Sequence, residues 1–488
     1  MQDGTLLAAV DLGSNSFRLE IGRLEHGQIQ RIEYLKETVR QGAGLDGNHN
    51  LTPDAMQRGW DCLARFAERL AGFTRPQVRA VATQTLREAA NRDVFIARAS
   101  AILGFPIEVV SGLEEARLIY KGVARLLPQS DERRLVVDIG GRSTELILGR
   151  QFTPSAAASC RVGSVSWSAR FFADGAFSAS AFQAAEVAAQ AVFEEALDQF
   201  PPGSWDVAYG SSGTVGAAAA ALGQAGVITQ EGLDWLLAQL LQARSADRLR
   251  LEGLKDDRRA VIGGGLSILR AVFALLGIQT MTVAQGALRQ GALYELIDRE
   301  QPATDLRSAS VRALMRRFAV DEPQAGRVAQ LATALFLQAA PAGGERAARK
   351  LDWAARLHEI GRAIAHGDHQ HHGAYILEHA DIAGFALPEL QRLALLVRAQ
   401  RGKLRRLGDA LDDPQLAWQL MCLRTALALC HARRAPDLDG LTLTLQGRRC
   451  TVRTRAGWAQ AYPQSAWLLR EEGNAWARTP WEYAAELG

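Results

Sequence analysis

The chain has 488 residues, of which 48% are hydrophobic and 22% charged, as expected for a globular protein with two to four domains. It has no run of about 18 uncharged apolar residues, which argues against a transmembrane helix. It also lacks the basic and apolar segments of a signal peptide, so we expect a cytoplasmic protein. Five scattered cysteines form no C-x-x-C pair, which favours buried thiols over disulfides or structural zinc.

Charge is unevenly distributed along the sequence. Residues 1–300 carry 31 Lys and Arg against 34 Asp and Glu, and residues 301–488 carry 25 against 19, which gives net charges of −3 and +6. A basic second half favours a polyanionic ligand along the C-terminal part. The alternative is that these arginines form solvated helix faces.

In the first part of the chain, short β-type runs alternate with helical patterns. Apolar residues recur at helical spacing over 53–72, and 92–103 is a second helix candidate. Alternating strands and helices predict an α/β domain. The expected strands are Leu6–Asp11, Phe17–Leu24, Val78–Ala82, Ile107–Val110 and Leu135–Asp138.

The strand-loop-strand pattern restarts near residue 135 and is followed by a helical pattern over 179–200 and a strand that ends at Tyr209. From about 304 to 435 the pattern is nearly all helical, and 441–455 alternates like a β-hairpin. We therefore expect α/β domains at 1–130 and 131–302, a helical domain at 303–440 and a small α/β domain at 441–488.

An internal repeat links the two α/β domains. Val10 to Gly22 aligns with Val137 to Gly149 at a constant offset of 127, and six of the thirteen positions are identical. In each copy an apolar strand ends in Asp, then Gly and small hydroxyl residues follow. Glycine lets backbone N–H groups face a bound phosphate. Two tight β-turns without a ligand are the alternative reading.

The two copies differ in a way that suggests separate tasks. The first offers Ser14, Asn15 and Ser16, with Arg18 nearby, and is the better phosphate cradle. In the second copy Glu145 stands at the position of Arg18. Carboxylates need a cation between themselves and phosphate, and Mg²⁺ is shared well by carboxylates, waters and phosphate oxygens. We expect Asp138 and Glu145 at this metal, with Asp11 from the first loop.

Six ordered motifs resemble the exopolyphosphatase and guanosine pentaphosphate phosphohydrolase family, within the superfamily of acetate and sugar kinases, heat-shock chaperones and actin. They begin at Val10, Ala82, Ser111, Val137, Gly210 and Ala287. The resemblance implies two ribonuclease H-like (actin-like) domains with a cleft between them, then a helical, degenerate HD-like domain and a mixed α/β tail. It also implies Mg²⁺, with a monovalent cation such as K⁺ as a further candidate, and a homodimer.

The resemblance also implies site residues. Glu115, the second Glu of Ser111-Gly-Leu-Glu-Glu-Ala-Arg117, matches the family's catalytic carboxylate, which would orient the attacking water; Glu114 is the adjacent alternative. One departure is Arg142, where the family usually has a third glycine. It would be costly if that backbone needs positive φ, and it would otherwise add a phosphate donor. The further expected phosphate-binding residues are Arg87, Gly140, Gly141, Arg142, Ser143, Thr144, Ser212 and Gly213.

The C-terminal half adds two clusters. Six of the nine histidines fall within 358–379, and Leu357-His-Glu-Ile-Gly361 resembles the core of metal-dependent HD phosphohydrolases, but Glu359 stands where the defining Asp should be. We therefore expect a degenerate domain used for binding or dimerisation. A basic run is the candidate track for a polyphosphate chain, the alternative being a solvated face. Its residues are Arg398, Arg401, Lys403, Arg405 and Arg406.

The sequence is compatible with several functions. An exopolyphosphatase that releases terminal orthophosphate from inorganic polyphosphate is the leading hypothesis, and guanosine pentaphosphate 5′-phosphohydrolase is the alternative. An actin-like or chaperone-like ATP-dependent switch is more remote, as is a polyphosphate scaffold without activity. We expect neither nucleic acid nor a membrane as partner.

Overall fold

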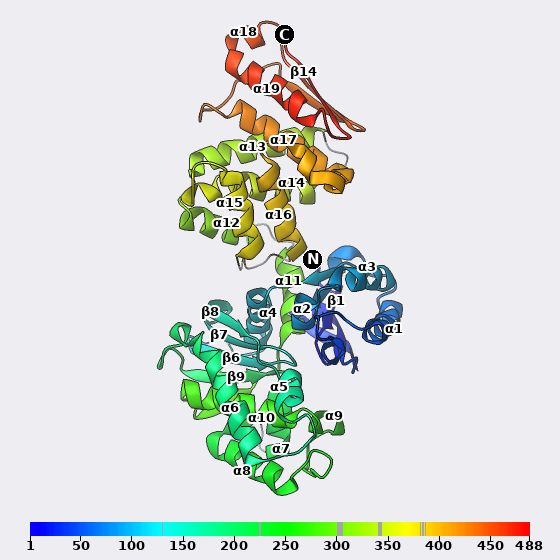
Figure 1. The fold of residues 1–488 in the computed structure, drawn as a ribbon, viewed down its shortest axis with the longest axis vertical. Coiled ribbons are helices and arrows are strands. Elements are labelled where there is room, and N and C mark those ends of the chain that lie inside the picture. Colours follow the sequence, from blue (N-terminus) through cyan, green and yellow to red (C-terminus); the bar gives the residue numbers. More distant parts are fainter. Residues whose placement is uncertain are drawn as a thin grey trace. The chain divides into compact units, whose positions relative to one another are not determined.

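The computed structural model describes residues 1–128, 130–223, 226–299, 306–339, 344–380, 382, 385 and 387–488 (Figure 1). The chain forms two compact units, 1–305 and 306–488, which are described separately. Unit 1 contains two sheets, each covered by helices, and each sheet with its helices is called a lobe.

The first lobe is built on a five-stranded sheet of order β3-β2-β1-β4-β5. β1 pairs antiparallel with β2 and parallel with β4. The strand β1 is buried along almost its whole length, as the apolar run predicted. The elements are β1 Leu6–Leu12, β2 Phe17–Glu25, β3 Gln28–Glu37, α1 Pro53–Arg69, β4 Val78–Ala82, α2 Gln84–Glu88, α3 Arg92–Leu103, β5 Ile107–Val109 and α4 Gly112–Arg125.

The second lobe is built on a six-stranded sheet of order β10-β11-β9-β6-β7-β8. β6 pairs antiparallel with β7 and parallel with β9, so it takes the central place that β1 takes in the first lobe. The elements are β6 Arg133–Ile139, β7 Thr144–Arg150, β8 Thr153–Cys160, α5 Ser164–Phe171, α6 Ala179–Glu194, β9 Val207–Ser211, α7 Ser212–Leu222, β10 Val227–Thr229, α8 Gln230–Ala243, α9 Asp256–Arg259, α10 Ile262–Leu276 and β11 Thr280–Val283.

The predicted repeat is a structural one. Asp11 pairs with Arg18 across the first hairpin, and Asp138 pairs with Glu145 across the second. The register also shifts at equivalent places, between Ile21 and Gly22 and between Leu148 and Gly149. A bulge increases local twist and re-aims a strand, so both hairpins bend at the same point beyond their loops.

Helix α4 lies between the two sheets, because its apolar side chains share one core cluster with Val81 of β4 and with Val136 and Ile147 of the second lobe. Helix α11, Leu288–Arg299, packs against α4 and β1 although it follows the second lobe in sequence. Gly122 and Gly291 let the two helices touch through their backbones, since a Cβ at Gly291 would stand 1.8 Å from the Leu118 carbonyl oxygen.

Unit 2 is helical over most of its length and ends in a three-stranded sheet of order β12-β13-β14. One hydrophobic core runs from Val311 to Tyr483, so the described helices and the small sheet share it. The hairpin expected at 441–455 is β12 with β13. The elements are α12 Leu306–Arg317, α13 Glu322–Ala339, α14 Glu345–Arg356, α15 His369–His379, α16 Leu387–Ala399, α17 Pro414–Leu429, β12 Thr442–Gln446, β13 Arg449–Arg453, α18 Trp458–Ala461, α19 Pro463–Trp476 and β14 Glu482–Glu486.

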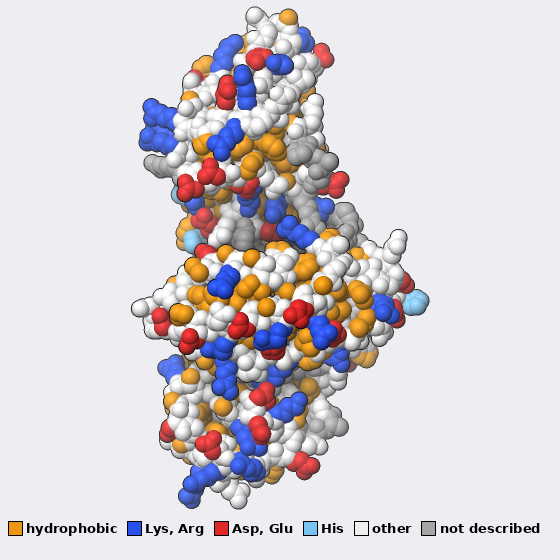
Figure 2. Space-filling view, turned by 90° about the vertical axis from the view of Figure 1, so that its right-hand side faces the viewer, with side chains coloured by type: hydrophobic (Ala, Val, Ile, Leu, Met, Phe, Trp, Pro, Cys, Tyr) orange, Lys and Arg blue, Asp and Glu red, His pale blue; other side chains and the backbone are white. Residues whose placement is uncertain are grey.

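All five cysteines are free and buried, as the sequence predicted. In the described residues, no helix combines the length and apolar character that crossing a membrane requires. Basic and acidic side chains are mixed with apolar ones over the face in Figure 2.

Candidate active site

A cavity of about 380 Å³ lies between the two lobes of unit 1 and is lined by both repeat hairpins. Most of the sequence-predicted residues meet there, although they come from segments more than a hundred residues apart. Those that line the cavity are Asp11, Ser14, Asn15, Ser16, Glu115, Asp138, Gly140, Gly141, Ser143, Ser212 and Gly213.

The two loops have matching geometry. A Cβ at Gly13 would stand 3.0 Å from the Ser16 carbonyl oxygen, and one at Gly140 would stand 3.0 Å from that of Ser143. A side chain at either glycine would need its neighbour to shift by a few tenths of an ångström, so glycine suits both turns. The buried Ser16 hydroxyl has no hydrogen-bond partner within the described residues. A buried polar group without a partner costs free energy, so a ligand that accepts from Ser16 would relieve that cost.

The turn after β9 completes this side of the cavity. Ser212 adopts a positive φ of 77°, a backbone conformation that costs free energy in a residue with a side chain. Its hydroxyl donates to the Ile139 carbonyl oxygen at 2.6 Å, which ties the turn to the end of β6. The strained turn thus holds Ser212 and Gly213 beside the second loop.

Glu115 enters the cavity from the first turn of α4. The helix is capped by Ser111, whose hydroxyl accepts from the Glu114 backbone N–H at 3.1 Å. Arg87 donates to the Glu115 carboxylate at 2.7 Å and to the Val110 carbonyl oxygen at 3.0 Å. Burial raises the pKa of Glu115 above its usual value, and Arg87 opposes this shift. Arg87 is therefore placed to orient Glu115 rather than to line the cavity.

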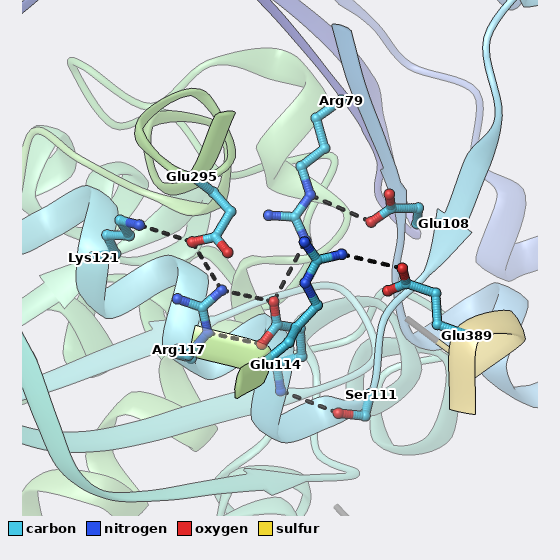
Figure 3. A network of polar contacts seen from close by, with 9 residues as sticks. Arg79, Glu108, Ser111, Glu114, Arg117, Lys121, Glu295 and Glu389 are labelled. Atoms are coloured by element: carbon cyan, nitrogen blue, oxygen red, sulfur yellow. Dashed lines mark hydrogen bonds and ion pairs between the residues drawn. The ribbon is translucent and has the colours of Figure 1, made fainter. Parts of the chain in front are cut away.

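Glu114 points away from the cavity, as expected for adjacent residues on a helix. Arg117 donates to its carboxylate from two nitrogens, both at 2.8 Å, and Arg79 approaches at 3.4 Å. Arg117 also reaches Glu295 of α11 at 3.0 Å, and Lys121 reaches the same carboxylate at 2.7 Å (Figure 3). This buried network fixes α4 against α11 and thereby holds the turn that carries Glu115.

Burial raises the pKa values of the two acidic residues of the second hairpin, Asp138 and Glu145. Burial raises the pKa of Asp138 to about 6. The pKa of Glu145 is raised well above its usual value by burial and then by the charges of Glu115 and Asp138. Glu145 lies behind the cavity wall: Ser159 donates to its Oε1 at 2.8 Å, and its Oε2 has no described partner.

These acids fit a magnesium ion that is held jointly with substrate. Within the described ranges, no three His, Cys, Asp or Glu side chains are grouped so as to hold a metal ion. Mg²⁺ usually keeps several waters and takes one or two carboxylates plus substrate phosphates, so a smaller protein set suffices. Asp138 lies on the cavity wall and could supply one such carboxylate, whereas Glu145 lies behind the wall and Asp11 is already paired with Arg18 at 3.0 Å.

Besides Arg87, two more predicted phosphate ligands lie outside the lining of the cavity. Thr144 is buried and donates to the Val162 carbonyl oxygen at 2.6 Å. Arg142 of the second lobe reaches Glu88 of the first lobe at 2.6 Å and the Gly42 carbonyl oxygen at 3.2 Å. The backbone of Arg142 does not adopt a positive φ, so an arginine is tolerated where the family has glycine. Its side chain bridges the lobes instead of lining the cavity.

Sequence reasoning missed several cations on the cavity wall. Arg289 of α11 contacts Asp11 at 3.5 Å and Glu20 at 3.2 Å, and it lies over the ring of Tyr34. Lys36 pairs with Arg18 in the register of β2 and β3, so the hairpin register is the signal that would have revealed it. Besides Arg18, which the sequence analysis named, the cations on the wall are Lys36, Lys255, Arg258 and Arg289.

The predicted polyphosphate track lies in unit 2. Arg398 forms an ion pair with Glu378 at 2.6 Å, while Arg401, Lys403 and Arg405 are exposed. The side chain of Arg406 lies outside the described structure. His358 and Glu359 are buried, and Glu359 is paired with Arg362 at 2.9 Å and Arg433 at 2.6 Å.

Two actin-like lobes around a cleft lined by cations and carboxylates define a phosphate-handling enzyme. The pattern of the Ppx/GppA phosphatase family matches residues 21–300, and that of its domain III matches residues 306–473. The chain belongs to the Ppx/GppA phosphatase family, and it is a phosphoanhydride hydrolase.

Relatives and solved structures support this assignment. A guanosine-5′-triphosphate,3′-diphosphate pyrophosphatase of Vibrio campbellii is 41% identical over 98% of this chain and 97% of its own length. One of Photobacterium profundum, with the same description, is 38% identical over 99% and 98%. The crystal structure of an exopolyphosphatase-like protein is 25% identical, with a TM-score of 0.55 over 60% of this chain and 98% of its own.

Proposed function

We propose that this protein hydrolyses guanosine 5′-triphosphate 3′-diphosphate, releasing the terminal phosphate of the 5′-triphosphate. The observation that carries the substrate is the 41% identity, over almost the whole of both chains, to a relative described as acting on it. Inorganic polyphosphate, which the sequence alone put first, becomes the second candidate. The cleft supports either, because its cations and hydroxyls suit phosphate groups of any origin.

The residues divide the work as follows. The loop at 13–16 and the turn at 212–213 cradle the terminal phosphate, whose charge Arg18 and Arg289 offset. Glu115 accepts a proton from the attacking water as the new P–O bond forms and the phosphoanhydride bond breaks. The products are orthophosphate and the nucleotide shortened by one phosphate. Positioning and charge neutralisation supply most of the rate in such reactions, and a general base contributes about 10²–10⁴.

Asp138 would hold Mg²⁺, which would neutralise charge on the transferred phosphoryl group. The proposal also includes a homodimer, a cytoplasmic location and a degenerate HD-like origin for residues 303–440, kept for binding or dimerisation. The basic run from Arg398 to Arg406 remains a proposed track for the second candidate substrate.

Orthophosphate release from four substrates tests the proposal: guanosine pentaphosphate, long polyphosphate, tripolyphosphate and ATP, each with and without Mg²⁺. We expect the highest kcat/KM for guanosine pentaphosphate and loss of activity without Mg²⁺. A higher kcat/KM for long polyphosphate would restore the exopolyphosphatase assignment. If ATP is hydrolysed faster than guanosine pentaphosphate and long polyphosphate, both candidate substrates are excluded.

A further inference from the structure

Three cations of the cavity wall have no assigned role in the proposed reaction. Lys36 lies on β3 of the first lobe, whereas Lys255 and Arg258 belong to the α9 segment of the second lobe. All three line the same cavity as Glu115. Within the described residues, neither Lys255 nor Arg258 has an ion-pair partner. Lys255 is exposed and Arg258 is half-buried, so both charges are available to an anion that enters the cavity.

Arg258 is held against the turn that borders the catalytic loops. A Cβ on Gly213 would stand 2.2 Å from Nη2 of Arg258 and 2.7 Å from its Cζ. The guanidinium therefore rests directly on the bare Cα of Gly213, at the start of α7. This contact places a planar donor, which suits phosphate oxygens, next to the cradle but outside it.

Lys36 has a partner that crosses the cleft. Its Nζ lies 3.1 Å from Oδ2 of Asp257, so the first lobe and the α9 segment are joined by one ion pair at the cavity. Burial lowers the pKa of Lys36, and the charges of Arg258 and Arg18 lower it further, against the effect of Asp257. Within the described residues, Asp257 pairs with Lys36 while Lys255 and Arg258 have no ion-pair partner, so these three cations keep a surplus of positive charge.

We propose that Lys36, Lys255 and Arg258 form a second anion subsite, which binds a phosphate group of the substrate remote from the bond that is hydrolysed. Asp257 is the placeholder that pairs with Lys36 until the substrate displaces it. The inference rests on the proposed function and names the 3′-diphosphate of the nucleotide as the ligand. A further stretch of a linear polyphosphate has the same chemistry and is the competing source.

The test compares kcat/KM for guanosine pentaphosphate and for GTP, which lacks the 3′-diphosphate. Arg258→Ala and Lys255→Ala are expected to lower the ratio of the two values about tenfold each, because a charge-assisted contact is lost. Arg259→Ala is the matched control, since this neighbour pairs with Asp256 at 2.7 Å and does not line the cavity. An unchanged ratio in both subsite variants would overturn the proposal.

Asp257→Asn provides a test of opposite sign. If Asp257 is a placeholder, its loss removes a competitor, and KM for guanosine pentaphosphate falls several-fold while KM for GTP changes less. If the ion pair only holds the lobes together, KM rises equally for both substrates, which would contradict the placeholder role. Thermal unfolding of each variant separates these effects from a loss of folded protein.

A third arm separates this inference from the proposed function. If the wild-type protein does not release phosphate from guanosine pentaphosphate, the proposed function fails. The same variants are then measured on long polyphosphate and tripolyphosphate. If the subsite variants lose kcat/KM only for long polyphosphate, the nucleotide assignment is overturned and the subsite binds polyphosphate. If kcat/KM falls equally for both chain lengths, or does not change, the subsite proposal is wrong.

Discussion

Arg87 and Glu115 form a charge-assisted hydrogen bond of 2.7 Å between α2 and the first turn of α4. The same guanidinium nitrogen donates to the Val110 carbonyl oxygen at 3.0 Å, and Gln84 accepts from the other two nitrogens at 3.0 and 2.6 Å. The arginine is thus fixed on several sides before it meets Glu115. It decides both where the proposed base points and how readily it loses its proton.

Arg87→Met should shift the pH dependence of the reaction. Burial raises the pKa of Glu115, and Arg87 lowers it. Without the arginine this pKa rises further, so the ionised base is lost at a higher pH and the acidic limb of kcat/KM moves upward. Arg87→Lys should restore part of the shift, because it returns the charge without the fixed geometry. An acidic limb that stays in place in Arg87→Met would show that another group controls it.

Glu114→Gln should reduce stability rather than abolish chemistry. Glu114 is fully buried and accepts two hydrogen bonds from Arg117, and removal of one partner of a buried pair costs about 3–5 kcal/mol. Urea unfolding should show this loss, while the folded fraction still releases phosphate. Glu68→Gln, on the exposed face of α1, is the control with little expected effect. A variant as stable as the wild type would show that the network in Figure 3 does not anchor α4.

Gly213→Ala should weaken substrate binding without weakening the fold. The added methyl group would displace the Arg258 guanidinium from its place on Gly213, so KM should rise. Gly213 is the second residue of α7 and does not adopt a positive φ, so alanine fits the backbone and the free energy of unfolding should change little. Gly216→Ala, in the same helix with open space around it, should leave KM unchanged. Equal KM values for the two variants would contradict the placement of Arg258.

The bridge between Arg142 and Glu88 should couple the lobes energetically. Both side chains are largely buried, and they meet at 2.6 Å. A double-mutant cycle with Arg142→Met and Glu88→Gln should give a coupling of about 1–3 kcal/mol in urea unfolding. The exposed pair of Arg69 and Glu33, which meets at 3.5 Å, should give a smaller value. A coupling energy near zero between Arg142 and Glu88 would mean that the bridge contributes nothing to the stability of the two packed lobes.

The repeat and the strands that carry it followed from the sequence because each is local, whereas Glu115 was singled out by the resemblance of its motif to a known family. The register of a hairpin is determined within one short stretch of sequence, so the constant offset of 127 predicted two equivalent loops. The direction of Arg142 could not be predicted, because its partner lies 54 residues away on another lobe. Nor could the role of α11, which returns to β1 and α4 after the whole second lobe.

The missed cations illustrate the same limit. Lys36 faces the cleft because β3 pairs with β2, and only the register of that pairing places it beside Arg18. Arg258 belongs to a helix of four residues and Lys255 directly precedes it, so this segment is too short to leave a periodic pattern in the sequence. The place of Arg258 beside Gly213 depends on how this segment packs against the start of α7.

The most direct measurement is the initial rate of orthophosphate release from guanosine pentaphosphate with Mg²⁺, compared between the wild-type protein and Glu115→Gln. Glutamine keeps the shape of the side chain but cannot accept a proton from water. The account predicts that kcat falls by about 10²–10⁴ while KM stays close to its wild-type value. Wild-type turnover in Glu115→Gln would contradict the assignment of Glu115 as the base in this cleft.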